Sequence, residues 1–134
     1  IKRFLFPKND FPKSVSISLF ILRVVFGGML MTHGWAKLMN FSAIAPNFMW
    51  GEIGLSLAIF AELICSAGVI VGLLYRLALI PMITTMAMAF FVIHKSILVG
   101  EGNGELALLY LAVFFILFII GPGKISIDNF IAKK

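Results

Sequence analysis

Charged residues and cysteine are scarce in this sequence. Only 13% of its 134 residues are charged, and Cys65 is its one cysteine. A single cysteine cannot form an internal disulfide, a Cys-x-x-Cys redox pair or a c-type haem attachment. We therefore expect neither thiol–disulfide exchange by this chain alone nor a covalently bound cofactor.

The sequence also lacks the short motifs of several protein classes. It has no glycine-rich phosphate loop, no nucleophile elbow and no zinc signature. The net charge is +5, but there is no long basic run, and the positive residues stand beside apolar segments. The sequence therefore assigns no metal and gives no reason to expect a nucleic-acid partner.

Apolar sequence is abundant. The chain is 61% hydrophobic with a mean hydropathy of +1.08, more than a soluble domain of this size can bury. Four segments approach the roughly 20 residues that a membrane helix needs: Ser14–Leu38, Gly51–Leu74, Arg76–Ile97 and Gly104–Gly121. The sequence predicts an all-α integral membrane protein, with an antiparallel four-transmembrane-helix bundle at residues 14–123.

Short polar segments flank the predicted bundle. Residues 1–13 are basic, contain Pro7 and Pro12, and do not resemble a cleavable signal peptide, so we expect them at the membrane interface. Gly121-Pro122-Gly123 is a strong helix stop. Residues 124–134 have apolar residues at helical spacing and end in two lysines. This pattern predicts an amphipathic tail on the membrane surface.

Basic residues gather on one side of the predicted spans. That side holds both ends of the chain and the turn before the third span, with Lys2, Arg3, Lys8, Lys13, Arg76, Lys124, Lys133 and Lys134. The other side holds Lys37 and Lys95 together with Glu52 and Glu105. By the positive-inside rule, we expect both termini to face the cytoplasm.

Arg23 and Glu62 interrupt two of the apolar segments. An ionisable group at membrane depth is costly, marks a functional site by default and needs a partner. At about 1.5 Å per residue, both groups fall near the midplane of consecutive antiparallel helices. We therefore expect an Arg23–Glu62 ion pair, with Ser66 and Tyr110 as further acceptors for the arginine. The pair is either a staple that fixes helix register or a site that handles protons or a ligand.

Small residues accompany both charges. The first helix has one stripe formed by Arg23, Gly27, Leu30, Gly34 and Lys37, and the second has one formed by Ala58, Glu62, Cys65 and Ser66. Small residues let membrane helices approach closely, which favours contact between these faces. Gly68-x-x-x-Gly72 is a similar packing signature, for the bundle interior or for a partner subunit.

A second polar group maps to the side opposite the termini. Its possible ligand-binding members are His33, Lys37, Glu52, His94 and Glu105. Packing at the interface and favourable helix dipoles are the ordinary explanation for such residues. The histidines also allow contact with a quinone headgroup, axial ligation of a b-type haem, or a metal site with Glu52 or Glu105. A tight four-helix bundle offers haem little room, which disfavours haem b.

The order of several short motifs is similar to that of a known family. These are Leu22-Arg23 with Gly27-Gly28, His33-Gly34-Trp35-Ala36-Lys37-Leu38, Glu62 with Gly68 and Gly72, Arg76 and Pro81, Gly104-Glu105-Leu106-Ala107, and Gly121-Pro122-Gly123. From about Ser18 to Gly123, the chain resembles the DoxX family of small four-helix membrane proteins. The resemblance implies a multi-pass protein of the inner (plasma) membrane, similar to the small subunit of a thiosulfate:quinone oxidoreductase.

The resemblance implies a subunit rather than a self-sufficient enzyme, because the chain has no flavin, haem c or iron–sulfur motif. We expect a membrane subunit or accessory protein of a larger redox or respiratory assembly, with lipid, other membrane subunits and quinone as its contacts. It would be at most a subunit of a quinone-linked oxidoreductase. One alternative is a scaffold or assembly factor without chemistry of its own. Another is a small proton or solute conduit through the Arg23–Glu62 layer.

Overall fold

Helices account for all the regular structure in the described ranges of the chain. The computed structural model describes residues 11–95, 98–100 and 104–132. Its elements are α2 (Lys13–Met39), α3 (Phe41–Ile44), the 3₁₀ helix η1 (Ala45–Asn47), α4 (Gly51–Ile59), the π-helix η2 (Phe60–Cys65), α5 (Ser66–Val71), α6 (Tyr75–Met88), the π-helix η3 (Ala89–Ile93), α7 (Glu105–Ile120) and α8 (Ile127–Ala132). The predicted all-α class is confirmed.

Three helical stretches are long and apolar enough to cross a membrane. They are Lys13–Met39, Gly51–Val71 and Tyr75–Ile93. The fourth apolar helix, α7, has only 16 residues. At about 1.5 Å per residue it measures about 24 Å, less than the roughly 30 Å of a typical hydrocarbon core. The fourth predicted segment is therefore helical but short, and local bilayer thinning can accommodate such a helix.

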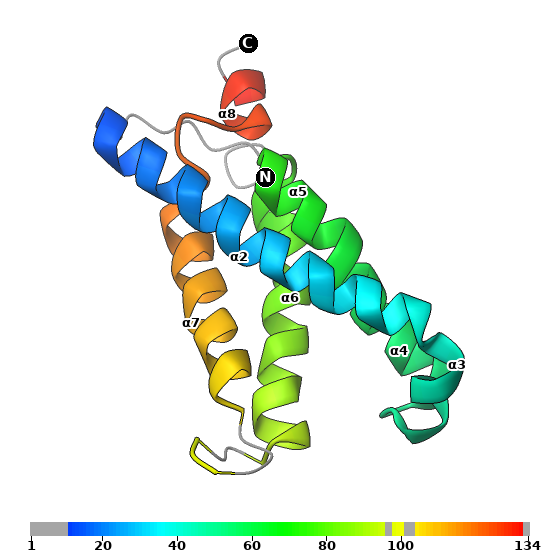
Figure 1. Cartoon of the computed structure of the whole chain (residues 1–134). Coiled ribbons are helices and arrows are strands. Elements are labelled where there is room, and N and C mark those ends of the chain that lie inside the picture. Colours follow the sequence, from blue (N-terminus) through cyan, green and yellow to red (C-terminus); the bar gives the residue numbers. More distant parts are fainter. Residues whose placement is uncertain (1–10, 96–97, 101–103, 133–134) are drawn as a thin grey trace.

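Successive long helices run in opposite directions, as the colour sequence in Figure 1 shows. α2 lies across the second helix, where it packs against η2 and α5, and α6 packs along α7. The beginning of α2, the turn between α5 and α6, and α8 all lie at one end of the molecule. The short helix α3 and the beginning of α4 lie at the other end.

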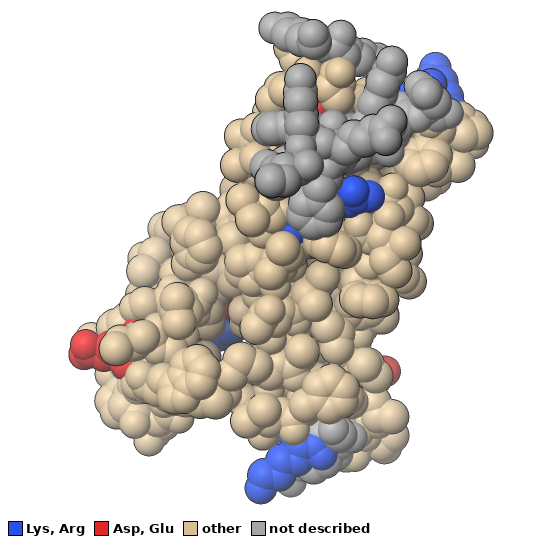
Figure 2. Space-filling model, turned by 180° about the vertical axis from the view of Figure 1, so that it is seen from behind, with Lys and Arg blue, Asp and Glu red and all other residues tan. Residues whose placement is uncertain are grey.

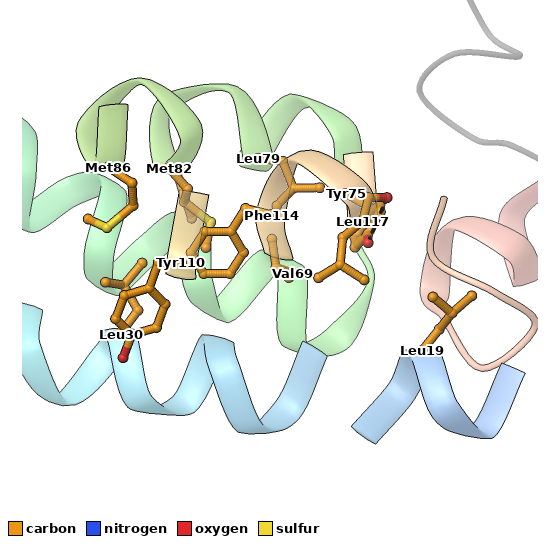
Figure 3. Close-up of a cluster of buried hydrophobic side chains, with 11 residues drawn as sticks. Leu19, Leu30, Val69, Tyr75, Leu79, Met82, Met86, Tyr110, Phe114 and Leu117 are labelled. Carbon is orange, nitrogen blue, oxygen red and sulfur yellow. Dashed lines mark hydrogen bonds between the residues drawn. The ribbon is translucent and has the colours of Figure 1, made fainter. Parts of the chain in front are cut away.

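A column of buried apolar side chains fills the interior. Figure 3 shows Leu19, Leu30, Val69, Tyr75, Leu79, Met82, Met86, Tyr110, Phe114 and Leu117 in this core. The outward positions of the same helices are also apolar, with Ile53 exposed at 73% and Ile64 at 63%. Most charged atoms in Figure 2 lie toward the two ends of the molecule. An apolar interior combined with an apolar exterior suits helices whose solvent is lipid.

Some predictions concern residues at the ends of the chain and in one loop that lie outside the described residues. Residues 1–10 of the predicted interfacial segment, including Lys2, Arg3 and Lys8, lie outside the described residues, as do Lys133 and Lys134. The predicted end of the third span at Ile97 also lies outside them, and the helix itself ends at Ile93.

The tail after the helix stop packs against the bundle. On α8, Asp128 and Asn129 are 0% and 1% exposed, while Ile127 and Phe130 face outward with 40% and 62% exposure. α8 therefore has one buried polar side and one exposed apolar side. Its position on a membrane surface stays a prediction.

A buried ion pair and a carbonyl-bound arginine

Lys37 and Glu62 form an ion pair between the first and second membrane-crossing helices. Lys37 Nζ lies 2.7 Å from both carboxylate oxygens of Glu62. The Glu62 side chain is 2% exposed and that of Lys37 is 27% exposed. Lys37 stands in the last turn of α2, so its long side chain reaches from the helix end toward the buried carboxylate.

Local backbone features bring Glu62 against α2. A Cβ atom on Gly34 would lie 2.8 Å from Glu62 Cβ and 3.0 Å from Leu63 Cγ, so only glycine permits this approach. Glu62 itself lies in the π-helix η2, which interrupts an otherwise α-helical span. Single π-helical turns are rare and occur often at functional sites. The sequence pattern gave no sign of this interruption.

Arg23 is bound by backbone carbonyl groups at the other end of the bundle. Its Nε donates to Val69 O at 3.0 Å and its Nη2 to Ile70 O at 2.8 Å. Its Nη1 donates to Pro122 O and Ile125 O, both at 2.7 Å. Val69 and Ile70 belong to the last turn of α5, where the helix dipole favours a cation, and Val69 O also accepts a hydrogen bond from Gly72 N at 3.2 Å. The guanidinium thereby joins α2, α5 and the tail.

The predicted Arg23–Glu62 ion pair is therefore wrong, although both predicted stripes are buried at the helix contact except for Lys37 at the end of the first. Glu62 lies opposite Gly34, and Arg23 lies opposite Val69, seven residues further along the second helix. Seven residues correspond to about 10 Å along a helix. The prediction counted depth from the ends of the spans, but α2 extends beyond the end of α5 (Figure 1).

Asp128 is a structural residue that sequence reasoning missed. Its Oδ1 and Oδ2 each accept a hydrogen bond at 2.8 Å, from the backbone N–H groups of Leu74 and Tyr75 respectively. These N–H groups begin α6, where unpaired donors and the helix dipole favour a carboxylate. Burial raises the pKa of Asp128, against the smaller lowering effects of the two N–H groups and of the Arg23 charge. The sequence did carry a signal for this role, because Asp128 is the one acidic residue in the basic segment 124–134.

Gly72 permits close contacts with both the tail and Arg23. Gly72 has φ +75°, and a Cβ there would meet Ser126 and the Arg23 guanidinium. A Cβ on Gly68 would lie 3.5 Å from Ala78 Cβ of α6. Both glycines of Gly68-x-x-x-Gly72 therefore serve contacts within this chain, which decides one question that the sequence left open.

His33 and Tyr110 lie beside the ion pair. Their rings are in edge-to-face contact with a centroid separation of 6.1 Å. Glu62 is close enough to both His33 and Tyr110 to interact with each electrostatically. Ser66 and Tyr110, proposed from sequence as acceptors for Arg23, do not bind it; Ser66 Oγ and Tyr110 OH have no hydrogen-bond partner within the described part of the chain.

The other predicted ligand residues lie elsewhere. His94 follows η3 and packs near Gly104, where an added Cβ would lie 2.8 Å from His94 Cβ. Glu105 begins α7 and is exposed, and Glu52 is exposed in the first turn of α4. The structure thus brings His33 and Lys37 together with Glu62 rather than with these three residues.

Two other features bear on possible ligands. No group of three or more His, Cys, Asp and Glu side chains that could hold a metal ion occurs within residues 11–95, 98–100 and 104–132.

Two apolar grooves of about 380 and 640 Å³ lie between the second helix and α6, and Phe60, Ile80 and Pro81 line both. Neither groove is lined by any of the predicted site residues.

Comparison with known proteins identifies the family. The DoxX family model matches residues 18–95, more than half of the chain. The chain belongs to the DoxX family. This DoxX protein is also 34% identical, over 136 residues, to an uncharacterized protein of Haemophilus influenzae, and the alignment covers 94% of this chain and 99% of that protein. No solved structure matches.

The family match contains the whole Lys37–Glu62 pair and part of the Arg23 arrangement, because the Arg23 acceptors Pro122 and Ile125 lie beyond residue 95. Arg23, His33, Lys37 and Glu62 lie inside residues 18–95, whereas Tyr110 lies beyond them. The motifs noted above extended the resemblance to Gly123, so the matched region is shorter at its C-terminal side. Lys37 and Glu62 therefore both lie in the part of the chain that matches the family model.

Proposed function

We propose that this DoxX protein is an integral subunit or accessory protein of a larger redox assembly and contacts quinone beside Lys37 and Glu62. The observation that carries the proposal is the buried pair itself, with both N···O distances at 2.7 Å and Glu62 only 2% exposed. An ionisable pair between membrane helices is expensive and is typical of a functional position.

The chemistry of the pair suits a quinone headgroup. Lysine has three N–H donors, and two hydrogen bonds to Glu62 leave one donor for a carbonyl oxygen of the oxidised ligand. The carboxylate keeps lone pairs that can accept an O–H of the reduced ligand. Exposed His33 adds a ring that can donate or accept a hydrogen bond. A membrane-soluble ligand reaches this position from the lipid.

The electrons of such a reaction come from partner subunits. With its single cysteine and without a flavin, haem c or iron–sulfur motif, the chain supplies no redox group of its own. Its contribution is the hydrogen-bonding site and the membrane anchor. We include other membrane proteins among its partners for this reason.

We place the protein in the inner membrane with both termini in the cytoplasm. Lys13, Arg76 and Lys124 lie at the end that carries α8, whereas Lys37 and Lys95 lie toward the opposite end. The distribution of basic residues supports this orientation through the positive-inside rule. The quinone site then lies in the outer half of the membrane.

Haem b and a metal ion form no part of the proposal. His33 contacts Tyr110, and His94 packs near Gly104, so the two histidines have different neighbours. An optical spectrum of the purified protein without a Soret band is the expected result. A haem spectrum that disappears in His33→Ala would overturn this part of the proposal.

The test of quinone contact uses the full-length protein in mild detergent and a benzoquinone with a decyl tail as the probe. His33→Ala should weaken binding severalfold, and the doubly neutral variant Lys37→Gln with Glu62→Gln should weaken it further. His94→Ala is the matched control, because His94 lies outside the site, and should bind as the wild type does. Equal affinity in all variants counts against the site.

The subunit role has its own test. Purification of the wild-type protein from native membranes should retain a partner that carries a flavin, haem or iron–sulfur group. Recovery of the chain without any redox partner contradicts the assembly proposed.

A scaffold or assembly factor is the second candidate, and the Arg23 contacts favour it. Four backbone carbonyl groups from α5 and the tail bind one side chain, an arrangement that fixes structure and leaves little room for a ligand. Under this alternative, the assembly loses subunits when the chain is deleted, but quinone affinity does not depend on His33 or Lys37.

A further inference from the structure

Two buried hydroxyl groups lack a protein partner in an interior that otherwise satisfies its polar side chains. Among the described residues, these are Ser66 Oγ and Tyr110 OH, on side chains that are 0% and 2% exposed. An unpaired buried hydroxyl is costly because it has lost water and gained no other partner. Each such group in a native structure calls for an explanation.

Comparable hydroxyl groups elsewhere in the bundle are paired. Tyr75 is 0% exposed, and its hydroxyl donates to Leu117 O at 3.0 Å. Ser16 is 2% exposed, and its Oγ accepts from Lys124 N at 3.2 Å. The fold therefore pairs buried tyrosine and serine hydroxyls where they only support structure. The contrast sets Tyr110 and Ser66 apart.

Tyr110 is oriented toward the first helix, where the candidate site lies. In Figure 3 its hydroxyl points toward the pale blue ribbon of α2. Its ring contacts Phe26 and His33 edge-to-face, with centroid separations of 6.0 and 6.1 Å. Glu62 acts on it electrostatically. Ser66 follows Glu62 by four residues, and its backbone oxygen lies beside Gly27 of α2.

His33 connects Tyr110 with the exterior of the bundle. His33 is exposed, and its ring is in edge-to-face contact with the buried Tyr110 ring. The ring of Tyr110 thus contacts a residue that a ligand in the lipid can reach.

We propose that the Tyr110 hydroxyl is a hydrogen-bond donor reserved for a carbonyl oxygen of the ligand, and that it determines specificity for a quinone ring. This inference rests on the proposed quinone contact and deepens it. Lys37 has one N–H left after its bonds to Glu62, and Tyr110 has its O–H. The two donors suit the two carbonyl oxygens of a para-quinone. Ser66 supplies a further hydroxyl on the second helix.

Tyr110→Phe tests the inference, because it removes only the unpaired hydroxyl and keeps the ring. Binding of the decyl benzoquinone should weaken about three- to tenfold, as expected for one lost hydrogen bond. The unfolding temperature should stay the same or rise, because no protein contact is lost. A decyl benzene without carbonyl groups should bind wild type and variant alike.

Tyr75→Phe is the matched control. It removes the bond to Leu117 O, so the unfolding temperature should fall while quinone affinity stays unchanged. If the quinone binds to the wild type and to Tyr110→Phe with equal affinity, the role of Tyr110 is overturned and the quinone contact stays in place. No binding of the quinone to the wild type overturns the proposed contact and this inference together.

Discussion

Lys37 at the end of α2 is the partner of Glu62, and both carboxylate oxygens lie 2.7 Å from its Nζ. The relationship is asymmetric, because Glu62 is 2% exposed and Lys37 is 27% exposed. A lysine near a helix end can extend its ammonium group toward the polar interface when it loses its partner, whereas a buried carboxylate cannot. The two halves of the pair therefore respond differently to mutation.

Lys37→Met should destabilise the protein more than Glu62→Leu does. The first change leaves a buried carboxylate without its cation, for which losses of about 3–5 kcal/mol are typical. The second leaves an ammonium group that can reach the interface. The double variant should recover most of the loss, which thermal unfolding of the three proteins in the same detergent measures. A double variant as unstable as Lys37→Met contradicts the pairing.

Gly34→Ala should displace the second helix from α2. The new methyl would lie 2.8 Å from Glu62 Cβ, and overpacking of this kind costs about 1–3 kcal/mol. Gly28→Ala is the control, because nothing lies within 4 Å of its added Cβ. That change should stabilise α2 by about 1 kcal/mol through helix propensity. Equal effects of both changes on the unfolding temperature would show that the helices do not meet at Gly34.

Arg23→Lys should loosen the tail. An ammonium group cannot reproduce the planar fork that reaches carbonyl groups on both α5 and the tail. The loss of two charged hydrogen bonds corresponds to about 3–6 kcal/mol. Hydrogen exchange at residues 124–132 should accelerate. Arg76→Lys is the control, because Arg76 contacts Phe118 O at 3.1 Å and Ile119 O at 3.4 Å, both on α7. Hydrogen exchange in the tail that is equally fast in both variants contradicts the role of Arg23.

Asp128→Asn should change the pH dependence of stability. Burial raises the pKa of Asp128 above its ordinary 3.8, so the folded protein binds this proton more tightly than the unfolded chain does. The linked stabilisation is full below the ordinary pKa and is lost as the pH rises through the raised pKa. The unfolding temperature of the wild type relative to the asparagine variant should therefore fall across this acidic range. A relative rise instead would mean that the pKa is lowered.

The apolar segments were predictable because their signal is local. Length and composition identify the helices, and small residues at helical spacing identify the faces that meet, such as Gly27 and Gly34 on α2. The helix stop at Gly121-Pro122-Gly123 also depends only on backbone chemistry within a few residues. The short length of α7 and the π-helix around Glu62 are departures from these regular patterns.

The partners of the buried charges were not predictable in this way. Counting residues from the end of each segment places Arg23 and Glu62 at one depth. A small axial offset between α2 and the second helix moves the glutamate opposite Gly34 and within reach of Lys37. Register between helices is a property of their packing, and hydropathy along either helix does not contain it.

Residue types and their spacing along the chain are enough to predict that it is helical, apolar and built around ionisable groups that need partners. The packing of the helices is what brings Arg23 to carbonyl groups of α5 and the tail, and Asp128 to the first N–H groups of α6. Packing also gives His94 and His33 different neighbours and leaves the Tyr110 hydroxyl unpaired within the described residues. Hydrophobic burial depends on periodicity along one helix, whereas hydrogen-bond partners depend on distances between helices.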